Sequence, residues 1–274
     1  MLRHTFCHLP GISAAKEFAC WESGIHDWEG FVCRRPERLS ESSYASCCAQ
    51  IRICEKALEK KNARFFGEMT PAREHWRLFK EFRDETAFLD IETTGLSPGW
   101  DEITTIALYD GREARAFVKG KNLGDFRSEI RRYRQIVTYN GKCFDVPFIQ
   151  TQFGFRMDQV HLDLRYILAS IGYKGGLKLC ESALGIKRKG LEDVDGFMAV
   201  RLWQEYRKGN DKALETLLAY NLADAVNLET LMVLAYNEKL RNTPFADDMI
   251  DLPVRPAIPY RADRKIVKKL KSAF

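Results

Sequence analysis

The fold is decided by a ten-residue stretch, Thr86-Ala87-Phe88-Leu89-Asp90-Ile91-Glu92-Thr93-Thr94-Gly95. Its apolar first half predicts a buried strand that ends in a polar turn. Side chains two residues apart on a strand point to the same face, so Asp90 and Glu92 would lie side by side. Adjacent carboxylates repel each other unless a cation neutralises them. We therefore expect a cation site at the end of a buried strand; the alternative is a solvated acidic turn.

The segments around this strand predict an α/β fold. Two strands joined through Asp110-Gly111 form a hairpin after it, and strands then alternate with helices, which indicates a mixed sheet flanked by helices. The further strands are expected at 103–109, 114–119, 136–139 and 160–164. The helices are expected at 125–134, from Val146 onward, and at 177–184, 197–207 and 212–240.

The chain divides into four parts by its sequence pattern. Residues 1–35 hold short helical and turn patterns, and residues 36–83 read as an N-terminal helical region. In that region we expect one long helix from Leu39 to Asn62, opened by a Ser40 cap, and a second that starts at Thr70-Pro71. Residues 84–241 form the predicted α/β domain. Residues 242–274 contain four prolines and no periodicity, which predicts a mobile tail.

Composition excludes several classes of protein. The 274 residues are 45% apolar and 30% charged, which excludes disordered and fibrous proteins. The segment Met1-Leu2-Arg3-His4-Thr5 leads into polar residues rather than an apolar signal core, and no apolar run approaches the ~18 residues of a membrane span. We expect a cytoplasmic protein with no membrane association.

Eight cysteines are present, six of them in the first 54 residues. Cys47 and Cys54 share an apolar helical spacing with Ile51 and Leu58, which predicts buried structural thiols. The alternative is a metal site with the nearby histidines, although no Cys-x-x-Cys pair occurs.

Two further polar motifs follow the first. Asn140 and Asp145 lie in a turn between a predicted strand and a helix, and Tyr220 and Asp224 are four apart on the last long helix, so they face the same side. Alone, Asp145 could be a helix cap, and the helical pair could be two partly exposed positions.

Together and in this order, the three motifs closely resemble those of the DnaQ-like exonuclease family, in its tyrosine branch. Segments such as Glu74-His75-Trp76-Arg77-Leu78-Phe79 also resemble uncharacterised prokaryotic predicted exonucleases with an RNase H-like domain. The resemblance implies a ribonuclease H-like fold for residues 84–241 and two bound divalent cations, Mg²⁺ or Mn²⁺.

The same resemblance implies a role for each catalytic residue. Asp90 would bridge both ions, Glu92 and Asp224 would hold the ion that activates water, and Asp145 would support the other ion. Tyr220 would orient the attacking water. Its hydroxyl would not act as a strong base, because an unperturbed tyrosine has a pKa of ~10.

Nucleic-acid contacts are expected around these acids. Thr93, Thr94 and Gly95 would place the backbone against the terminal nucleotide, Leu96 would lie beside its base, and Asn140 would contact the next residue. The phosphate-binding candidates are Lys142, Arg165 and Lys178, for which an ordinary exposed cation is the alternative. Asp163 is expected to support the site or to start a helix rather than to be a fifth metal ligand.

Two regions outside the domain suggest further contacts with DNA. Leu9-Pro10-Gly11-Ile12-Ser13 resembles the hairpin of helix-hairpin-helix elements, which implies phosphate binding at Gly11; the alternative is a structural cap. The formal net charge is +5, and residues 255–274 hold seven basic residues against one acid. This tail is either a phosphate-binding arm or a solvated charge run.

These features predict a metal-dependent 3′→5′ exonuclease that acts on DNA in repair or processing. One alternative is an exonuclease of RNA, since no residue pattern distinguishes the sugar. Another is a nucleic-acid-binding module with little or no catalysis that assists a helicase or nuclease partner.

Overall fold

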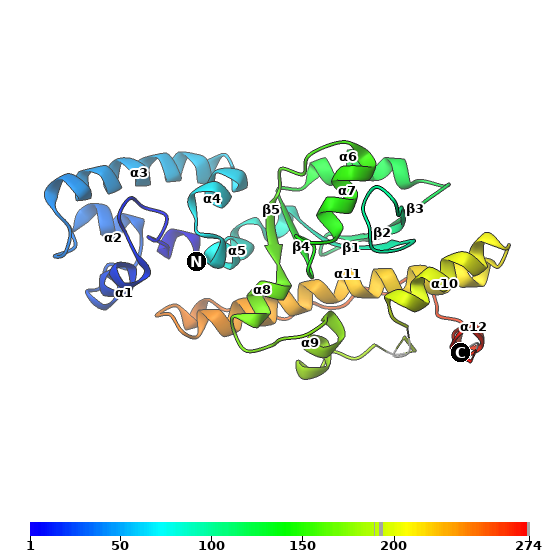
Figure 1. Ribbon diagram of the computed structural model, residues 1–274. Helices are drawn as coiled ribbons and strands as arrows, with labels where there is room; N and C mark the ends of the chain where they lie inside the picture. The colour runs from blue at the N-terminus through cyan, green and yellow to red at the C-terminus, as the bar shows by residue number, and fades with distance from the viewer. Residues whose placement is uncertain (189, 192–193, 273–274) are drawn as a thin grey trace.

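Five strands form one mixed sheet in the order β3-β2-β1-β4-β5. The computed structural model describes residues 1–188, 190–191 and 194–272 (Figure 1). The strands are β1 (Thr86–Thr93), β2 (Ile103–Tyr109), β3 (Ala114–Val118), β4 (Gln135–Thr138) and β5 (Val160–Asp163). β1 pairs antiparallel with β2 and parallel with β4, and β4 pairs parallel with β5, so the predicted mixed sheet is confirmed.

Helices cover both faces of the sheet, and β1 is buried between them. Ala87, Leu89 and Ile91 pack in one core cluster with residues of α6 (Phe126–Glu129) and α7 (Asp145–Phe153). Phe88 points to the other face, where it packs with residues of α11 (Asp211–Leu240). Figure 1 shows α11 along one side of the sheet and α6 and α7 on the other. By the period of two, Asp90 and Glu92 share the face of Phe88 and look toward α11.

The remaining helices of the α/β domain border this layer. They are α8 (Leu164–Ala169), α9 (Leu177–Ala183) and α10 (Gly196–Arg207), with 3₁₀ turns at Leu123–Asp125 and Ile130–Arg132. The helix expected at 125–134 is thus only one α turn between two 3₁₀ turns.

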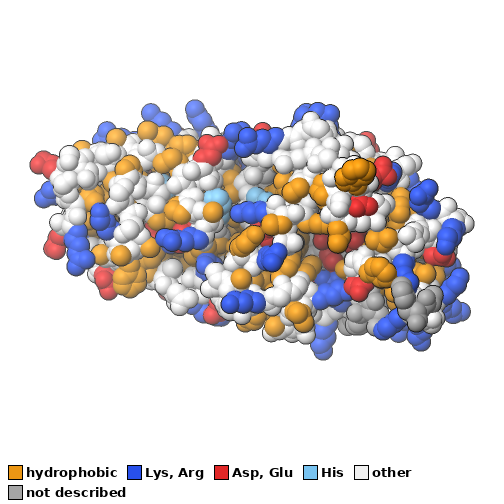
Figure 2. Space-filling view, in the orientation of Figure 1, with side chains coloured by type: hydrophobic (Ala, Val, Ile, Leu, Met, Phe, Trp, Pro, Cys, Tyr) orange, Lys and Arg blue, Asp and Glu red, His pale blue; other side chains and the backbone are white. Residues whose placement is uncertain are grey.

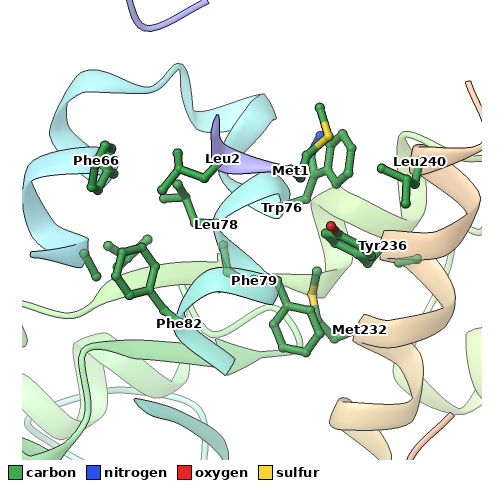
Figure 3. Packing of buried hydrophobic residues seen from close by; sticks show 14 of the residues in the cluster. Met1, Leu2, Phe66, Trp76, Leu78, Phe79, Phe82, Met232, Tyr236 and Leu240 are labelled. Atoms are coloured by element: carbon green, nitrogen blue, oxygen red, sulfur yellow. The ribbon is translucent and has the colours of Figure 1, made fainter. Parts of the chain in front are cut away.

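An N-terminal helical region packs against one end of α11. It consists of α1 (Ala14–Glu22), α2 (Trp28–Cys33), α3 (Glu41–Glu59), α4 (Ala63–Met69) and α5 (Phe79–Phe82), with 3₁₀ helices at Leu2–His4, Ala72–Leu78 and Arg83–Glu85. Figure 3 shows Trp76 and Phe79 of this region beside Tyr236 and Met232 of α11, and Leu2 beside Leu78 in the same cluster. A continuous apolar core therefore joins the region to the sheet domain.

Two helix predictions in this region need correction. The long helix ends at Glu59 rather than Asn62, because the Asn62 side chain accepts the main-chain N–H of Phe65 and caps a separate helix, α4. The segment after Pro71 is first a 3₁₀ helix and only then α5.

The N-terminal hairpin lies between a short 3₁₀ turn and a helix. Only the 3₁₀ turn Leu2–His4 precedes it, whereas α1 follows it with Ser13 as its cap. Gly11 is exposed and has a φ of 71°, a left-handed conformation that favours glycine.

The sequence predicted a C-terminal segment without regular structure, and the structure corrects this prediction. After a 3₁₀ turn at Ala246–Asp248, residues Arg264–Lys271 form the helix α12, which Asp263 caps. Val267 is 6% exposed and packs in a cluster with residues of α10 and α11, such as Leu202. The stretch with Pro253, Pro256 and Pro259 forms no helix or strand. The helix α12 after it nevertheless packs against α10 and α11 through Val267.

Helix α11 also departs from the expectation about apolar runs. By length and composition it could cross a membrane, yet 89% of its most apolar 18-residue window is buried inside the protein. Burial of this kind is typical of the central helix of a packed core.

Candidate active site

The acids of the three sequence motifs meet beside β1. Asp90 and Glu92 come from that strand, and Asp224 comes from the middle of α11, which packs across it. Carboxylate oxygens of these three residues lie within 4.8 Å of one another. Strand alternation and the packing of α11 thus gather residues that are up to 134 positions apart in the sequence.

Asp145 joins this group from the first turn of α7. Its Oδ1 accepts the main-chain N–H of Ile91 at 3.2 Å, so the carboxylate bonds to β1, between the two strand acids. The side chain does not cap α7. The interpretation of Asp145 as a simple helix cap is therefore wrong.

Burial makes the negative charge of this cluster costly. The pKa values of Asp90 and Glu92 are raised well above their usual range, first by burial and then by the carboxylate of Asp224. Burial raises the pKa of Asp145 to about 7. Burial also raises the pKa of Asp224 to about 6, against the opposing effect of Arg188. A divalent cation would remove this cost, and clustered carboxylate oxygens are the ligands that Mg²⁺ and Mn²⁺ prefer.

Arg188 is a part of the site that no sequence motif indicated. Its guanidinium donates from Nη1 to Asp224 and from Nε to Glu181 of α9. Its Nη2 is buried and has no hydrogen-bond partner among the described residues. Arg188 lies in the segment between α9 and α10, where spacing along the chain gives no signal of contact with α11.

Asn221 fixes the orientation of Asp90. Its Nδ2 donates to Oδ2 of Asp90 at 2.7 Å and to the main-chain oxygen of Asp90 at 3.1 Å. Thr105 of β2 donates to Oδ1 of Asn221 at 2.9 Å, which sets the amide in this orientation. In the sequence, the position of Asn221 directly after Tyr220 was a signal for a role in the site. That position alone could not predict that its partner is Asp90.

Comparison with known proteins agrees with this geometry. Residues 87–236, just over half of the chain, match the family model for the RNase H superfamily. The chain belongs to the RNase H superfamily. The match contains all four acids of the cluster.

Individual relatives of this RNase H superfamily chain are distant. It is 31% identical over 170 residues to the uncharacterized protein YprB of Bacillus subtilis (strain 168). That match covers 53% of this chain and 40% of YprB, so the chain spans less than half of its relative.

Solved structures with a similar arrangement include two proteins at 18% identity and a TM-score of 0.41. The family B DNA polymerase of the archaeon Pyrobaculum calidifontis is matched over 57% of this chain and 24% of the polymerase. Brucella melitensis NrnC, also solved with bound Mg²⁺, is matched over 62% of this chain and 82% of NrnC.

Tyr220 lies next to the acids of the RNase H superfamily domain. It is 5% exposed, and Lys178 Nζ lies 5.2 Å from the centroid of its ring. Burial, followed by the carboxylates of Asp224 and Glu92, raises the pKa of its hydroxyl above the usual range. The phenol is therefore neutral at ordinary pH and can donate a hydrogen bond. Lys178, predicted as a phosphate contact, stands half-buried at the same place.

The turn after β1 is held by one acid. Asp101 Oδ1 accepts the hydroxyl of Thr94 at 3.1 Å, and its Oδ2 accepts the main-chain N–H of Ser97 at 3.0 Å. A Cβ on Gly95 would lie 2.5 Å from the carboxylate oxygens of Asp101, so this glycine is required by the turn itself. Thr93 is buried, whereas Leu96 is 82% exposed and remains free to contact a nucleotide.

Asp163 organises the loop that follows β4. Its carboxylate accepts the main-chain N–H groups of Asn140 at 2.8 Å, Lys142 at 3.0 Å and Arg165 at 3.0 Å. Arg165 also donates from Nη1 to Oδ1 of Asn140 at 2.6 Å. The expected role of Asp163 at a helix start is confirmed, because it caps α8. The predicted contacts Asn140, Lys142 and Arg165 are thus neighbours, close in sequence to Asp145.

Two of the other predicted sites lie outside this constellation. Gly11 precedes α1, which Figure 1 shows at the far end of the molecule from the sheet. Cys47 and Cys54 are buried thiols, and no cluster of cysteine and histidine ligands occurs within the part of the chain that the structure describes.

Proposed function

We propose that this protein is a divalent-metal-dependent nuclease that removes nucleotides from the 3′ end of DNA, as a member of the tyrosine branch of DnaQ-like exonucleases. The observation that carries the proposal is the convergence of Asp90, Glu92 and Asp224 within 4.8 Å, with Asp145 bonded to the same strand. Membership of the RNase H superfamily supports phosphodiester chemistry at this place.

The residues fit two divalent ions in number and kind. Asp90, Glu92, Asp145 and Asp224 would hold Mg²⁺ or Mn²⁺, which would supply charge stabilisation for the phosphoryl group and the attacking and leaving oxygens. Asn221 keeps Asp90 in its orientation through the 2.7 Å hydrogen bond.

Tyr220 would position the attacking water. Its neutral hydroxyl donates a hydrogen bond and cannot remove a proton at neutral pH, since the pKa is raised by burial. Positioning of this kind predicts a slower but active Tyr220→Phe variant.

The 3′ polarity is supported by the likeness of the three motifs, whereas DNA is proposed because residues 9–13 resemble the hairpin of DNA-binding helix-hairpin-helix elements. Thr94 and Leu96 stand after the strand that carries Asp90 and Glu92, so a strand terminus would lie against this turn. Nothing among the described residues distinguishes ribose from deoxyribose, so RNA stays a substrate to be tested beside DNA.

The test is digestion of matched single-stranded DNA, duplex DNA and RNA, each labelled at the 5′ or the 3′ end. With Mg²⁺ or Mn²⁺, we expect 5′-labelled single-stranded DNA to shorten stepwise and 3′-labelled DNA to release its label first. EDTA and Asp90→Asn should abolish both. The matched control is Asp251→Asn, which changes an exposed acid outside the cluster. Full activity of Asp90→Asn would contradict the proposal, and shortening from the 5′ end would contradict the polarity.

A further inference from the structure

A groove runs along the edge strand β5, between the sheet and the N-terminal helical region. Three cavities of about 370, 190 and 100 Å³ lie in a row there. The first and second share Arg64, Arg156 and Asp158 in their walls, and the second and third share His75 and His161. Shared walls make the three cavities one continuous feature, which we call the β5 groove.

The β5 groove is positively charged. Six cations line it against three acids, Glu68, Asp158 and Asp163. The cations are Arg64, Arg73, Arg131, Arg134, Lys142 and Arg156. By contrast, the cavity beside α1 has two cations and two acids, and the cavity between α2 and α3 has two cations and three acids. Figure 2 shows Lys and Arg side chains, with histidines near them, along the junction of the helical region and the sheet.

Some of these cations are already paired, but not all. Arg64 is bound to Glu68 at 2.8 Å and to Asp158 at 3.4 Å, and Arg134 is bound to Glu85 at 2.9 Å. Arg131 and Lys142 are exposed and form no ion pair within the described ranges, and Arg156 has only a 3.9 Å pair with Asp158. The surplus charge therefore lies on exposed side chains that a polyanion can reach.

Flat rings alternate with the cations. Half-buried Phe155 lines the first cavity, half-buried His75 and His161 line the second, and Tyr166, which is 52% exposed, lines the third. Bases of a single strand stack on such rings without sequence preference, while the cations neutralise the backbone. Alternation of cationic and aromatic side chains is thus the chemistry of a single-strand track.

One end of the groove lies at the loop that leads into Asp145. Lys142 lies in the wall of the third cavity, three residues before Asp145, and its main-chain N–H donates to Asp163 at 3.0 Å. The opposite end holds Arg131 and Arg134, which precede β4, so it lies at the other end of the strands β4 and β5.

We infer that the β5 groove binds the single nucleic-acid strand that leads away from the active site. The inference rests on the proposed function for the identity of the chain that reaches the acid cluster. Short substrates would occupy the catalytic end alone, and longer strands would gain affinity along β5.

The test is a charge reversal at the far end of the groove, Arg131→Glu/Arg156→Glu, in the full chain. Binding of 5′-fluorescein-labelled 12-nucleotide single strands, DNA and RNA, is followed by anisotropy in EDTA over a range of salt. We expect the affinity to fall at least tenfold, and the slope of log K against log salt to decrease by about 1.4, for two lost phosphate contacts. The matched control is Arg207→Glu/Lys208→Glu at the end of α10, where the neighbouring Tyr206 lies near Lys121 and the opposite edge of the sheet.

Hydrolysis of thymidine 5′-p-nitrophenyl phosphate with Mg²⁺ separates the two proposals, since this compound reaches only the catalytic end. The groove variant should hydrolyse it at the rate of the unaltered protein. If the unaltered protein hydrolyses neither this compound nor oligonucleotides, the proposed function fails. If it hydrolyses them but the groove variant binds 12-mers with unchanged affinity and salt slope, the groove inference is overturned. The neutral variant Arg131→Gln/Arg156→Gln repeats the test should the reversed charges unfold the chain.

Discussion

At the scale of single residues, Arg188 has the least expected role. Its guanidinium forms ion pairs with Glu181 and Asp224. It therefore neutralises part of the negative charge that a bound metal ion would otherwise neutralise. A cation that binds Asp224 must compete with Arg188 for the same oxygens. The side chain therefore stabilises the metal-free protein and opposes metal binding at Asp224.

Replacement of Arg188 by alanine should reveal this competition. We expect the free energy of unfolding in EDTA to fall by about 3 kcal/mol, because two buried carboxylates lose their counter-charge. Saturating Mg²⁺ should recover part of the loss, and the dissociation constant for Mg²⁺ should decrease. Urea denaturation with and without Mg²⁺, together with calorimetric titration, measures both effects. Arg207→Ala is the control, and an equal loss of stability in EDTA and in Mg²⁺ would show that Arg188 acts through packing alone.

Asp145 should make stability depend on pH in a defined direction. Its pKa in the folded protein is about 7, above the 3.8 of an ordinary aspartate, so between these values the folded state binds a proton that the unfolded state has lost. Stability from this group is therefore present below pH 4 and is lost as the pH rises toward 7, by at most ~1.4 kcal/mol per pH unit.

The measurement is urea denaturation in EDTA at several pH values between 4.5 and 8, with Asp145→Asn as the comparison. His8 and His161, whose pKa values are lowered to about 4 and about 3 by burial, produce the opposite slope in both proteins and cancel in the difference. We expect the unaltered protein to lose stability relative to Asp145→Asn as the pH rises. Mg²⁺ should stabilise the unaltered protein more at pH 8 than at pH 5. Parallel curves for the two proteins would refute the raised pKa.

At the scale of elements, the docking of α12 makes a prediction that a mobile tail does not. Val267 is 6% exposed in a core cluster, whereas the adjacent Lys268 is exposed. We expect Val267→Ala to lower the free energy of unfolding by about 1–2 kcal/mol and Lys268→Ala to change it by less than about 0.5 kcal/mol. Equal, negligible effects in thermal denaturation would mean that α12 is detached in solution.

The elements also show how far local sequence patterns reach. Strand β1 and its acids were predictable because a strand has a strict period of two and an apolar face must be buried. The break between α3 and α4 was not predictable, since Asn62 can continue a helix or cap one, and in the structure it caps α4, whose Phe66 is buried.

The candidate site likewise contains residues that the sequence predicts and one that it does not. Asp90, Glu92, Asp145 and Asp224 share motifs that the sequence displays directly. The approach of Arg188 to Asp224 is a tertiary contact between an irregular segment and a helix 36 residues away. No local preference encodes such a contact.

At the scale of the whole molecule, the helical region and the sheet domain share one core. Buried side chains of the N-terminal region, among them Leu2 and Phe79, pack with Met232 and Tyr236 of α11. A second link is electrostatic, because Arg83 at the end of the helical region donates to the buried Glu229 of α11 at 2.7 Å. The helix α11, which carries Tyr220 and Asp224, is therefore supported at one end by residues outside the family match.

This shared core predicts that a chain beginning at residue 84 does not reach the native state. Several large side chains of α11 would become exposed at roughly 1.5–3 kcal/mol each, and their sum is comparable to the 5–15 kcal/mol that stabilises a typical domain. We expect the shortened chain to retain helical circular dichroism while binding a hydrophobic dye and losing slow hydrogen exchange. The control is the chain without residues 264–274, which loses only α12 and should unfold cooperatively. A chain of residues 84–274 that melts cooperatively within a few degrees of the full protein would show that the sheet domain is independent.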